Sequence, residues 1–258
     1  MDTQTQGGAA TLPQLLHGDC LELMQTIPDK SVDMVLCDLP FGITYCEWDK
    51  IIPLVPLWKQ YKRIIKDNGA IILFASQPFT TKLIHSNFKE YRYNWYWKKS
   101  GATGGVFAKV QPMRCIEDIC VFYKSKPTYN PQGLVKLDKP IIKRGNHKSD
   151  VYKWRGKDGV QEYTGYPKNL IEFKKDKTKL HPTQKPVALL EYLIKTYTDA
   201  GETVLDNCMG SGSTGVACVN TGRKFIGIEL NEHYYNVAKE RITNAIEDRE
   251  RQITLYET

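Results

Sequence analysis

The segment Ala70–Ala75 is a run of six consecutive apolar residues, which is the length of one β-strand. A strand that is apolar on both faces is typical of a parallel sheet with helices packed above and below it. Strand-like segments at 32–38, 203–206 and 224–229 alternate along the chain with segments of helical character. This alternation predicts an α/β fold with a doubly wound, mostly parallel sheet.

The remaining elements follow from hydrophobic spacing and from turn residues. Helices are expected at 53–66, 80–88, 186–197, 214–221 and 232–247, and further strands at 91–97 and 116–123. Asn68-Gly69 should end the first of these helices, because both residue types are common at helix C-termini. Between Lys124 and Lys179 the periodicity is lost, which predicts an inserted subdomain or long loops. Aromatic residues in that segment argue against a disordered linker.

The net charge of +7 is concentrated in one part of the chain. Residues 133–186 contain 14 Lys and Arg against 6 Asp and Glu, whereas the rest contains 22 against 23. Such a basic segment indicates a surface that faces a polyanion. The alternative is a lysine-rich insertion that is simply solvated.

Cysteine content and hydropathy indicate the compartment. Seven cysteines without paired spacing indicate reduced thiols, and the absence of Cys-x-x-Cys with scattered histidines predicts no metal site. No apolar run reaches the roughly eighteen residues of a membrane span, and the polar N-terminal residues do not resemble a signal peptide. We therefore expect a cytoplasmic protein with no membrane partner.

An acid, a proline and an aromatic residue follow the predicted strand at 32–38. Asp38-Leu39-Pro40-Phe41 should line a site, since ligands of open α/β sheets bind outside the carboxyl ends of the strands. A carboxylate, a rigid backbone carbonyl and a flat ring together suit a planar amine. The exocyclic amino group of a nucleobase is such an amine.

A second constellation combines a strand, a glycine turn and a helix. Gly210, Gly212 and Gly215 satisfy G-x-G-x-x-G, so a nicotinamide-dependent dehydrogenase is an alternative. However, Asp206 directly precedes the turn, where a carboxylate would repel a pyrophosphate but can meet a cation. S-adenosylmethionine carries a sulfonium and an ammonium and no phosphate. The segment His181–Pro186 leads into a helix whose free N–H groups can hold a carboxylate.

These motifs resemble those of amino-methylating DNA methyltransferases. Asp38–Phe41 is similar to their Asp-Pro-Pro-Tyr motif, Leu205–Gly215 to Asp-Pro-Phe-x-Gly-Ser-Gly-Thr-Thr, and His181–Pro186 to His-Pro-Thr-x-Lys-Pro. Phe225–Glu229 resembles the strand whose acid binds the cofactor ribose, and Gly18–Cys20 resembles the element that reaches the adenine of the cofactor. The order of the motifs resembles the β class, which has a circularly permuted Rossmann-like methyltransferase fold.

The resemblance implies three parts and the residues of a site. A catalytic half at 12–127 and a cofactor-binding half at 181–250 would flank a basic target-recognition insertion at 128–180. The implied catalytic residues are Asp38, Leu39, Pro40 and Phe41. The residues implied to bind the cofactor, S-adenosylmethionine, are Asp19, Cys20, Asp38, Thr183, Lys185, Asp206, Cys208, Gly210, Ser211, Gly212, Glu229 and Leu230. The residues expected to bind DNA are Lys136, Lys143, Arg144, Lys148, Lys153, Arg155 and Lys157.

The implied activity is site-specific methyl transfer to the 6-amino group of adenine in DNA. Asp38 at the first motif position favours adenine in this family, and the alternative is the 4-amino group of cytosine. Leu39 and Cys208 depart from the family pattern, which motivates a second alternative, a non-catalytic DNA-binding module with a degenerate methyltransferase fold. A homodimer is also compatible with the resemblance, because many relatives dimerise.

Overall fold

The computed structural model describes residues 12–42, 49–143, 148–149, 154–155, 158–178, 180 and 183–257. The chain divides into two compact units. The main unit comprises Met1–Asn130 and Asn169–Thr258, and the ribbon unit comprises Pro131–Lys168. Within the described residues, every helix is too short or too polar to cross a membrane.

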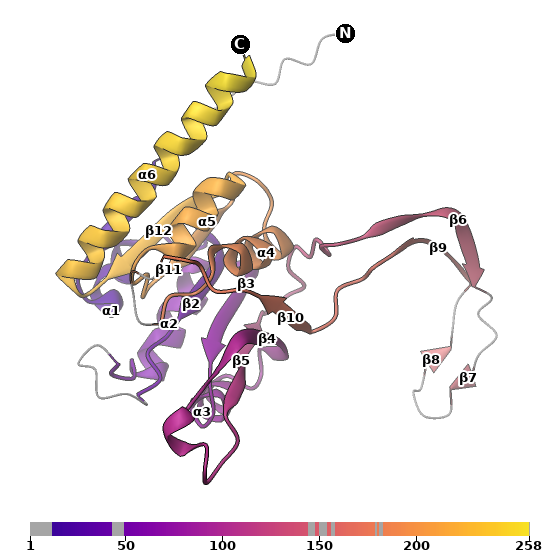
Figure 1. The fold of residues 1–258 in the computed structure, drawn as a ribbon, viewed down its shortest axis with the longest axis horizontal. Coiled ribbons are helices and arrows are strands. Elements are labelled where there is room, and N and C mark those ends of the chain that lie inside the picture. The colour runs from indigo at the N-terminus through magenta and orange to yellow at the C-terminus, as the bar shows by residue number, and fades with distance from the viewer. Residues whose placement is uncertain are drawn as a thin grey trace. The chain divides into compact units, whose positions relative to one another are not determined.

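The main unit is built on an eight-stranded sheet with the order β1-β12-β11-β2-β3-β5-β4-β10 (Figure 1). Its strands are β1 Gln14–His17, β2 Val32–Asp38, β3 Ile65–Ala75, β4 Tyr91–Thr103, β5 Arg114–Phe122, β10 Leu170–Phe173, β11 Thr203–Asp206 and β12 Lys224–Glu229. In this sheet β5 runs antiparallel to β3 and β4, and the other neighbours pair in parallel. The predicted mostly parallel sheet is confirmed.

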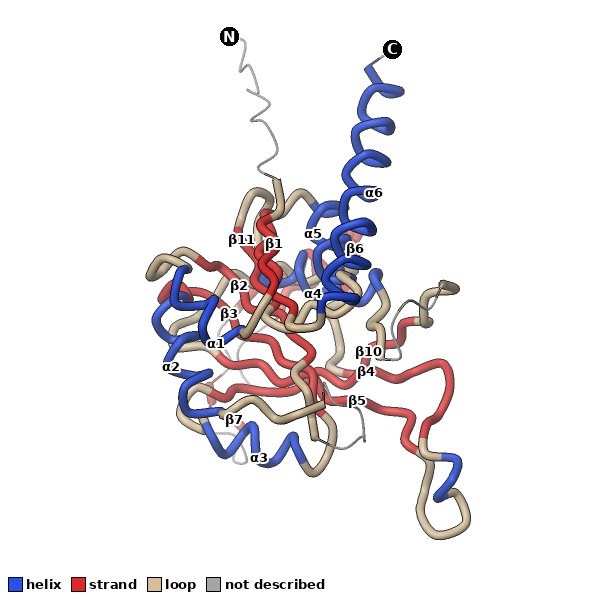
Figure 2. Tube along the Cα trace, turned by 90° about the vertical axis from the view of Figure 1, so that its left-hand side faces the viewer, coloured by secondary structure: helices blue, strands red, loops and turns tan. Residues whose placement is uncertain are grey.

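Helices cover both faces of this sheet, as Figure 2 shows. One set is α1 Cys20–Leu23, α2 Leu54–Ile64 and α3 Phe79–Ser86, with the short 3-10 helix η1 Met24–Thr26 after α1; the other is α4 Val187–Tyr197, α5 Ser213–Thr221 and α6 Glu232–Glu257. Side chains alternate between the two cores. Leu36 and Ile72 belong to the core beneath α4–α6, whereas Val35 and Ile71 belong to the core beneath α1–α3. The two cores explain why β2 and β3 are apolar at almost every position.

The predicted helix end at Asn68-Gly69 is wrong. The helix α2 ends at Ile64 and the chain passes directly into β3, so Asn68 and Gly69 lie inside a strand. The pairing of β2 with β3 is irregular there, because its register shifts on β2 between Val32 and Met34. A β-carbon on Gly69 would lie 2.7 Å from the backbone oxygen of Asp33. Glycine is needed at this position because the two backbones approach closely, and not as a helix cap.

The loss of periodicity between Lys124 and Lys179 does not mean that strands are absent. In the ribbon unit, β6 Val135–Lys143 pairs antiparallel with β9 Gly159–Thr164, and β7 Lys148–Ser149 pairs with β8 Trp154–Arg155. Most residues of β6 and β9 are exposed, so neither strand shows the alternation of a half-buried strand. The strand β10 also falls in this segment, but it pairs with β4 in the main sheet.

Candidate active site

The carboxyl ends of several parallel strands open into one cavity of about 1060 Å³ in the main unit. Asp38 is the last residue of β2, Asp206 of β11 and Glu229 of β12. These strands are neighbours in the sheet, so the three acids reach the same edge. Two segments far apart in sequence, the turn that follows Asp38 and the glycine turn at Gly210, therefore line one cavity.

Almost all of the residues predicted to bind the cofactor line this cavity. They are Asp19, Cys20, Asp38, Thr183, Lys185, Asp206, Cys208, Gly210, Ser211, Glu229 and Leu230, and the adjoining Leu39, Pro40 and Phe41 line it as well. Gly212 is the exception. A β-carbon on Gly212 would lie 2.9 Å from the β-carbon of Ala238, so this glycine allows α5 to pack closely against α6.

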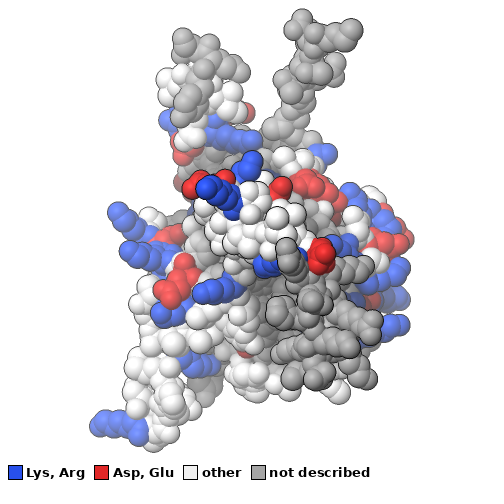
Figure 3. All heavy atoms as spheres, turned by 90° about the vertical axis from the view of Figure 1, so that its right-hand side faces the viewer, with Lys and Arg blue, Asp and Glu red and all other residues white. Residues whose placement is uncertain are grey.

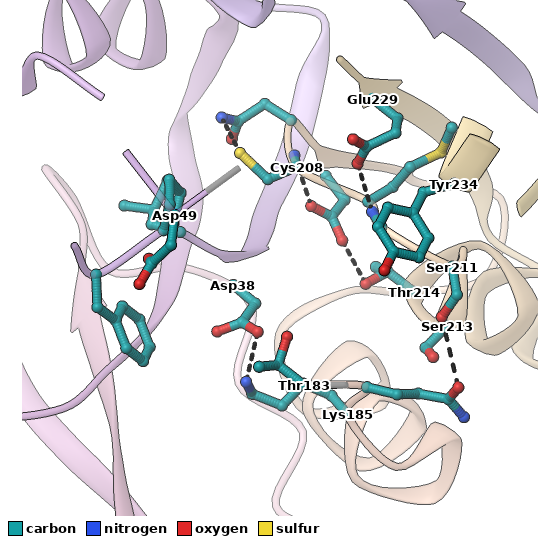
Figure 4. A pocket seen from close by; sticks show the side chains of 18 of the residues that line it. Asp38, Asp49, Thr183, Lys185, Cys208, Ser211, Ser213, Thr214, Glu229 and Tyr234 are labelled. Atoms are coloured by element: carbon teal, nitrogen blue, oxygen red, sulfur yellow. Dashed lines mark hydrogen bonds and ion pairs between the residues drawn. The ribbon is translucent and has the colours of Figure 1, made fainter. Parts of the chain in front are cut away.

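The glycine turn is fixed by a carboxylate at the end of β12. The backbone N–H of Gly210 donates a hydrogen bond of 2.8 Å to Oε2 of Glu229 (Figure 4). The N–H of Asn231 donates one of 2.8 Å to Oε1. Gly210 has a φ of 52°, in the left-handed region that glycine adopts without strain. The turn and Glu229 are thus held together at the edge of the cavity.

Asp206 is buried beneath the glycine turn, and both of its oxygens have protein partners. The hydroxyl of Thr214 donates to Oδ2 at 2.6 Å, and the N–H of Cys208 donates to Oδ1 at 3.1 Å. Burial raises the pKa of Asp206 to about 6, although both hydrogen bonds lower it. The carboxyl group therefore joins the end of β11 to the start of α5.

Asp38 has two oxygens in different surroundings. The ammonium group of Lys185 donates to Oδ2 at 2.5 Å, as Figure 4 shows, whereas Oδ1 is buried and has no hydrogen-bond partner among the described residues. Burial raises the pKa of Asp38 to about 6; Lys185 lowers it, and the nearby carboxylate of Glu117 raises it. A buried acceptor without a protein partner is expected where a ligand supplies the donor.

Lys185 belongs to a buried network of charges that the sequence did not reveal. It is 8% exposed, so its ammonium group is not a solvated surface charge. Its Nζ lies 2.9 Å from Oε1 of Glu117, and Nζ of Lys99 lies 3.5 Å from Oε2 of the same carboxylate. Burial disfavours the charged form of Lys185, but Asp38 and Glu117 outweigh it and raise its pKa. Burial likewise opposes ionisation of Glu117, but the two lysines lower its pKa.

The aromatic residue of the catalytic motif is held by its neighbours. The ring of Phe41 stacks on Phe79, with 5.4 Å between ring centroids and an interplanar angle of 27°. The next residue, Gly42, donates its backbone N–H to Oδ1 of Asp49 at 2.8 Å, which fixes the chain after the motif. Leu39 is buried. The half-buried ring of Phe41 therefore lies at the wall of the cavity beside the carboxylate of Asp38.

Some predicted residues fall elsewhere. His181 and Pro182, together with Arg144, Lys153 and Lys157, lie outside the described residues. The backbones of Lys148 and Arg155 lie in β7 and β8, and Lys136 and Lys143 are exposed on β6. Among the described residues, no group of three or more His, Cys, Asp or Glu could hold a metal ion.

Three comparisons with known proteins show which family the chain belongs to. A family model, N6_N4_Mtase, described as DNA methylase, matches residues 32–240. DNA adenine methyltransferase YhdJ of Escherichia coli K12 is 28% identical over 250 residues, covering 88% of this chain and 82% of that protein. Type II methyltransferase M.HinfI of Haemophilus influenzae is 28% identical over 263 residues, covering 90% of this chain and 68% of that protein.

Two solved structures share the fold. The M1.HpyAVI–SAM complex has a TM-score of 0.62 at 24% identity, covering 89% of this chain and 100% of that one. The cytosine-N4-specific PvuII DNA methyltransferase has a TM-score of 0.68 at 17% identity, covering 93% of each chain. The predicted α/β fold of methyltransferase type is confirmed by these likenesses, and the dehydrogenase alternative is wrong. Since the family model spans well over half of the sequence, the chain belongs to the N6_N4_Mtase family of DNA methylases.

Proposed function

We propose that this protein transfers a methyl group from S-adenosylmethionine to the 6-amino group of adenine in DNA. The observation that carries the proposal is the position of Asp38. It ends β2 with one oxygen buried and without a hydrogen-bond partner among the described residues, in the cavity that Gly210 and Glu229 also line. Asp38, which can accept a hydrogen bond from an amine, and the turn that would bind the methyl donor are then parts of one site.

The residues of the cavity fit S-adenosylmethionine. Asp38, Asp206 and Glu229 are three of the seven acidic residues that line it, against five basic residues, and the acidic excess suits a ligand with a sulfonium and an ammonium group. Glu229 would hold the ribose hydroxyls, and Asp19 the amino group of the adenine. Thr183 would hold the methionine carboxylate. The expectation that free N–H groups at the start of α4 hold it is wrong, because the N–H of Val187 already donates to the carboxylate of Asp176. When bound, S-adenosylmethionine supplies an electrophilic methyl group.

Asp38, Leu39 and Phe41 prepare the amine. The exocyclic nitrogen of adenine is a poor nucleophile because its lone pair is delocalised into the ring. Oδ1 of Asp38 and the backbone carbonyl of Leu39 would each accept one amino hydrogen and localise the lone pair on nitrogen. These hydrogen bonds strengthen as the nitrogen becomes positive, so they stabilise the transition state more than the ground state. Phe41 would stack on the base.

The target base must leave the duplex to reach Asp38, at a cost of a few kcal/mol. DNA is the polyanion that best suits the basic residues between 133 and 186. We assign target recognition to residues 128–180, with Lys136 and Lys143 among the residues that contact phosphates. The motif order, with Asp38 before the insertion and Gly210 after it, is the circularly permuted order of the β class.

Cytosine N4 is the second candidate base, and the likeness of fold to the cytosine-N4-specific PvuII enzyme favours it. The chemistry would be the same, because that group is also an exocyclic amine on a conjugated ring. The Asp at position 38 and the similarity to the adenine methyltransferase YhdJ favour adenine.

The test is to incubate genomic DNA with the protein and labelled methyl donor, digest it to nucleosides and identify the product by mass spectrometry. We expect N6-methyladenine, and sequencing of the modified DNA would then give the target site. N4-methylcytosine would establish the second candidate. Asp38→Ala should abolish methylation while donor affinity, measured by calorimetry, is retained. An unmodified DNA sample together with no donor binding would contradict the proposal and favour the non-catalytic module.

A further inference from the structure

The hairpin between β4 and β5 carries an unusual set of exposed apolar side chains. Its tip contains the 3-10 helix η2 Gly105–Phe107. Val106 is 93% exposed, Phe107 55% and Val110 81%, and Met113 and Ile116 are also exposed. Burial of apolar surface is a main source of stability, so exposed apolar residues gathered in one loop indicate a binding surface.

The charge of the hairpin has one sign. Residues 98–116 contain four basic residues, Lys98, Lys99, Lys109 and Arg114, and no acid. In Figure 3 the hairpin is the projection at the lower left, mostly white with blue groups along it. A solvent-facing loop of a protein surface normally mixes both signs. An apolar tip flanked by basic side chains suits a partner with an anionic surface and an apolar interior.

The hairpin begins at the edge of the catalytic cavity. Lys99, Thr103 and Arg114 line that cavity together with Asp38, and Thr103 pairs with Arg114 where the two strands separate into the tip. Beyond this pair the chain extends away from the sheet, as Figure 2 shows. A molecule that places one group beside Asp38 would therefore lie close to the tip.

The tip stands clear of the rest of the main unit. A β-carbon added at Gly101 or at Gly104 would meet no atom within 4 Å. Gly104 has a φ of 88° and begins η2, so the turn that presents Val106 and Phe107 uses a glycine-favoured backbone. The surroundings of the tip leave room for a large partner.

We propose that Val106 and Phe107 enter the base stack of duplex DNA and occupy the space left by the base that is extruded towards Asp38. This inference rests on the proposed function. Duplex DNA has an apolar stack of bases between two rows of phosphates, which matches the apolar tip and its flanking Lys109 and Arg114. Apolar side chains that wedge between base steps offset part of the cost of unstacking.

The test compares two duplexes that carry the mapped target site. In one the target base is paired, and in the other it lies opposite an abasic position, so that little energy is needed to extrude it. Phe107→Ala should lower the single-turnover rate on the paired duplex by about tenfold or more, because the wedge lowers the cost of extrusion. On the duplex with the abasic position its rate should stay within about threefold of the unmodified protein. With 2-aminopurine at the target position, the rise in fluorescence on binding should be smaller for Phe107→Ala.

Phe88→Ala is the matched control, since Phe88 is 73% exposed in the turn after α3 and lies outside the hairpin. It should leave both rates and the fluorescence unchanged. Equal losses on both duplexes, or no loss with Phe107→Ala, would overturn the inference. So would a Phe107→Ala protein that changes only its oligomeric state, because the tip would then be a protein contact. If the unmodified protein methylates neither duplex, the proposed function itself fails, and this inference fails with it.

Discussion

Asp38 and Lys185 are 147 positions apart in sequence, and among the described residues their side chains form the shortest ion pair at the cavity. Lys185 also contacts Glu117, so one buried cation serves two buried carboxylates. Taking three charges out of water is costly, and their mutual attraction offsets that cost only while all three are present. The network orients Oδ2 of Asp38 and leaves Oδ1 without a partner among the described residues, which is the oxygen that we propose accepts from the substrate.

The pKa of Asp38 predicts an acid limb in the rate of methyl transfer. Burial raises this pKa to about 6, with Lys185 lowering it and Glu117 raising it. Only the ionised carboxylate offers both oxygens as acceptors, so activity should be lost as the pH falls through about 6. Single-turnover rates at saturating donor should drop by about tenfold for each pH unit below that value. A rate that is constant from about pH 5 to pH 7 would contradict the role given to Asp38.

Replacement of Lys185 should destabilise the fold. Lys185→Met leaves Asp38 and Glu117 buried without their shared cation, and we expect a loss of about 3 kcal/mol in the free energy of unfolding. Urea denaturation at neutral pH measures it. The control is Lys195→Met on α4, the helix that follows Lys185, because Lys195 makes a 3.9 Å ion pair with Glu191 and is half exposed. That change should lower the free energy of unfolding by less than about 0.5 kcal/mol. Similar losses for both variants would show that the buried network stabilises the fold no more than an exposed ion pair does.

At the scale of elements, the contact between α5 and α6 depends on glycine. Gly212 begins α5 with a φ of 78°, and a β-carbon there would lie 2.9 Å from that of Ala238 on α6. Gly212→Ala should therefore add a steric clash to the cost of a left-handed alanine, for a total loss of about 2 to 4 kcal/mol. Thermal or urea unfolding measures this loss.

Gly201 provides a matched control for that experiment. Its φ is 82°, but a β-carbon at Gly201 would meet no atom within 4 Å. Gly201→Ala should lower the free energy of unfolding by about 1 to 2 kcal/mol, which is the cost of holding an alanine in the left-handed region. An equal loss at both positions would mean that α6 moves aside without cost and that Gly212 is not a packing residue.

Elements whose local pattern coincides with their burial could be predicted from sequence. The strands Thr203–Asp206 and Lys224–Glu229 are found at the predicted residues because each is a short apolar segment bounded by turn residues. Asn68-Gly69 misled the prediction, since a close approach of two strands uses the same residue type as a helix cap. The predicted end of α6 near Glu247 was ten residues early, because the polar last turns lack an apolar stripe.

The candidate site could be predicted only in part, because some of its contacts depend on tertiary packing and not on a local pattern. Asp38, Asp206 and Glu229 each end a strand, so the rule for parallel sheets placed them at one edge. The contact between Glu117 and Lys185 depends on how β5 packs against the segment before α4, and no local pattern encodes that. Two adjacent acids inside a strand, Glu117 and Asp118, were the only local signal.

At the scale of the whole molecule, basic and acidic residues are unevenly distributed along the chain. Residues 133–186 hold an excess of basic residues, and the rest of the chain is close to neutral. The cavity of the main unit is lined by seven acidic and five basic residues, an excess that suits the proposed cationic donor. If the basic segment binds DNA as proposed, ionic strength should affect the two ligands differently.

Affinity for DNA should fall steeply with salt, whereas affinity for S-adenosylmethionine should change little. Each phosphate contact that is lost should reduce the slope of log K against log salt by about 0.9, because fewer counterions are released. The double variant Lys136→Ala and Lys143→Ala should reduce the slope by about 1.8, as measured by fluorescence anisotropy over a series of salt concentrations. Lys195→Ala, outside the basic segment, should leave it unchanged. A slope in the double variant equal to that of the unmodified protein would mean that Lys136 and Lys143 are merely solvated and that other residues contact the phosphates.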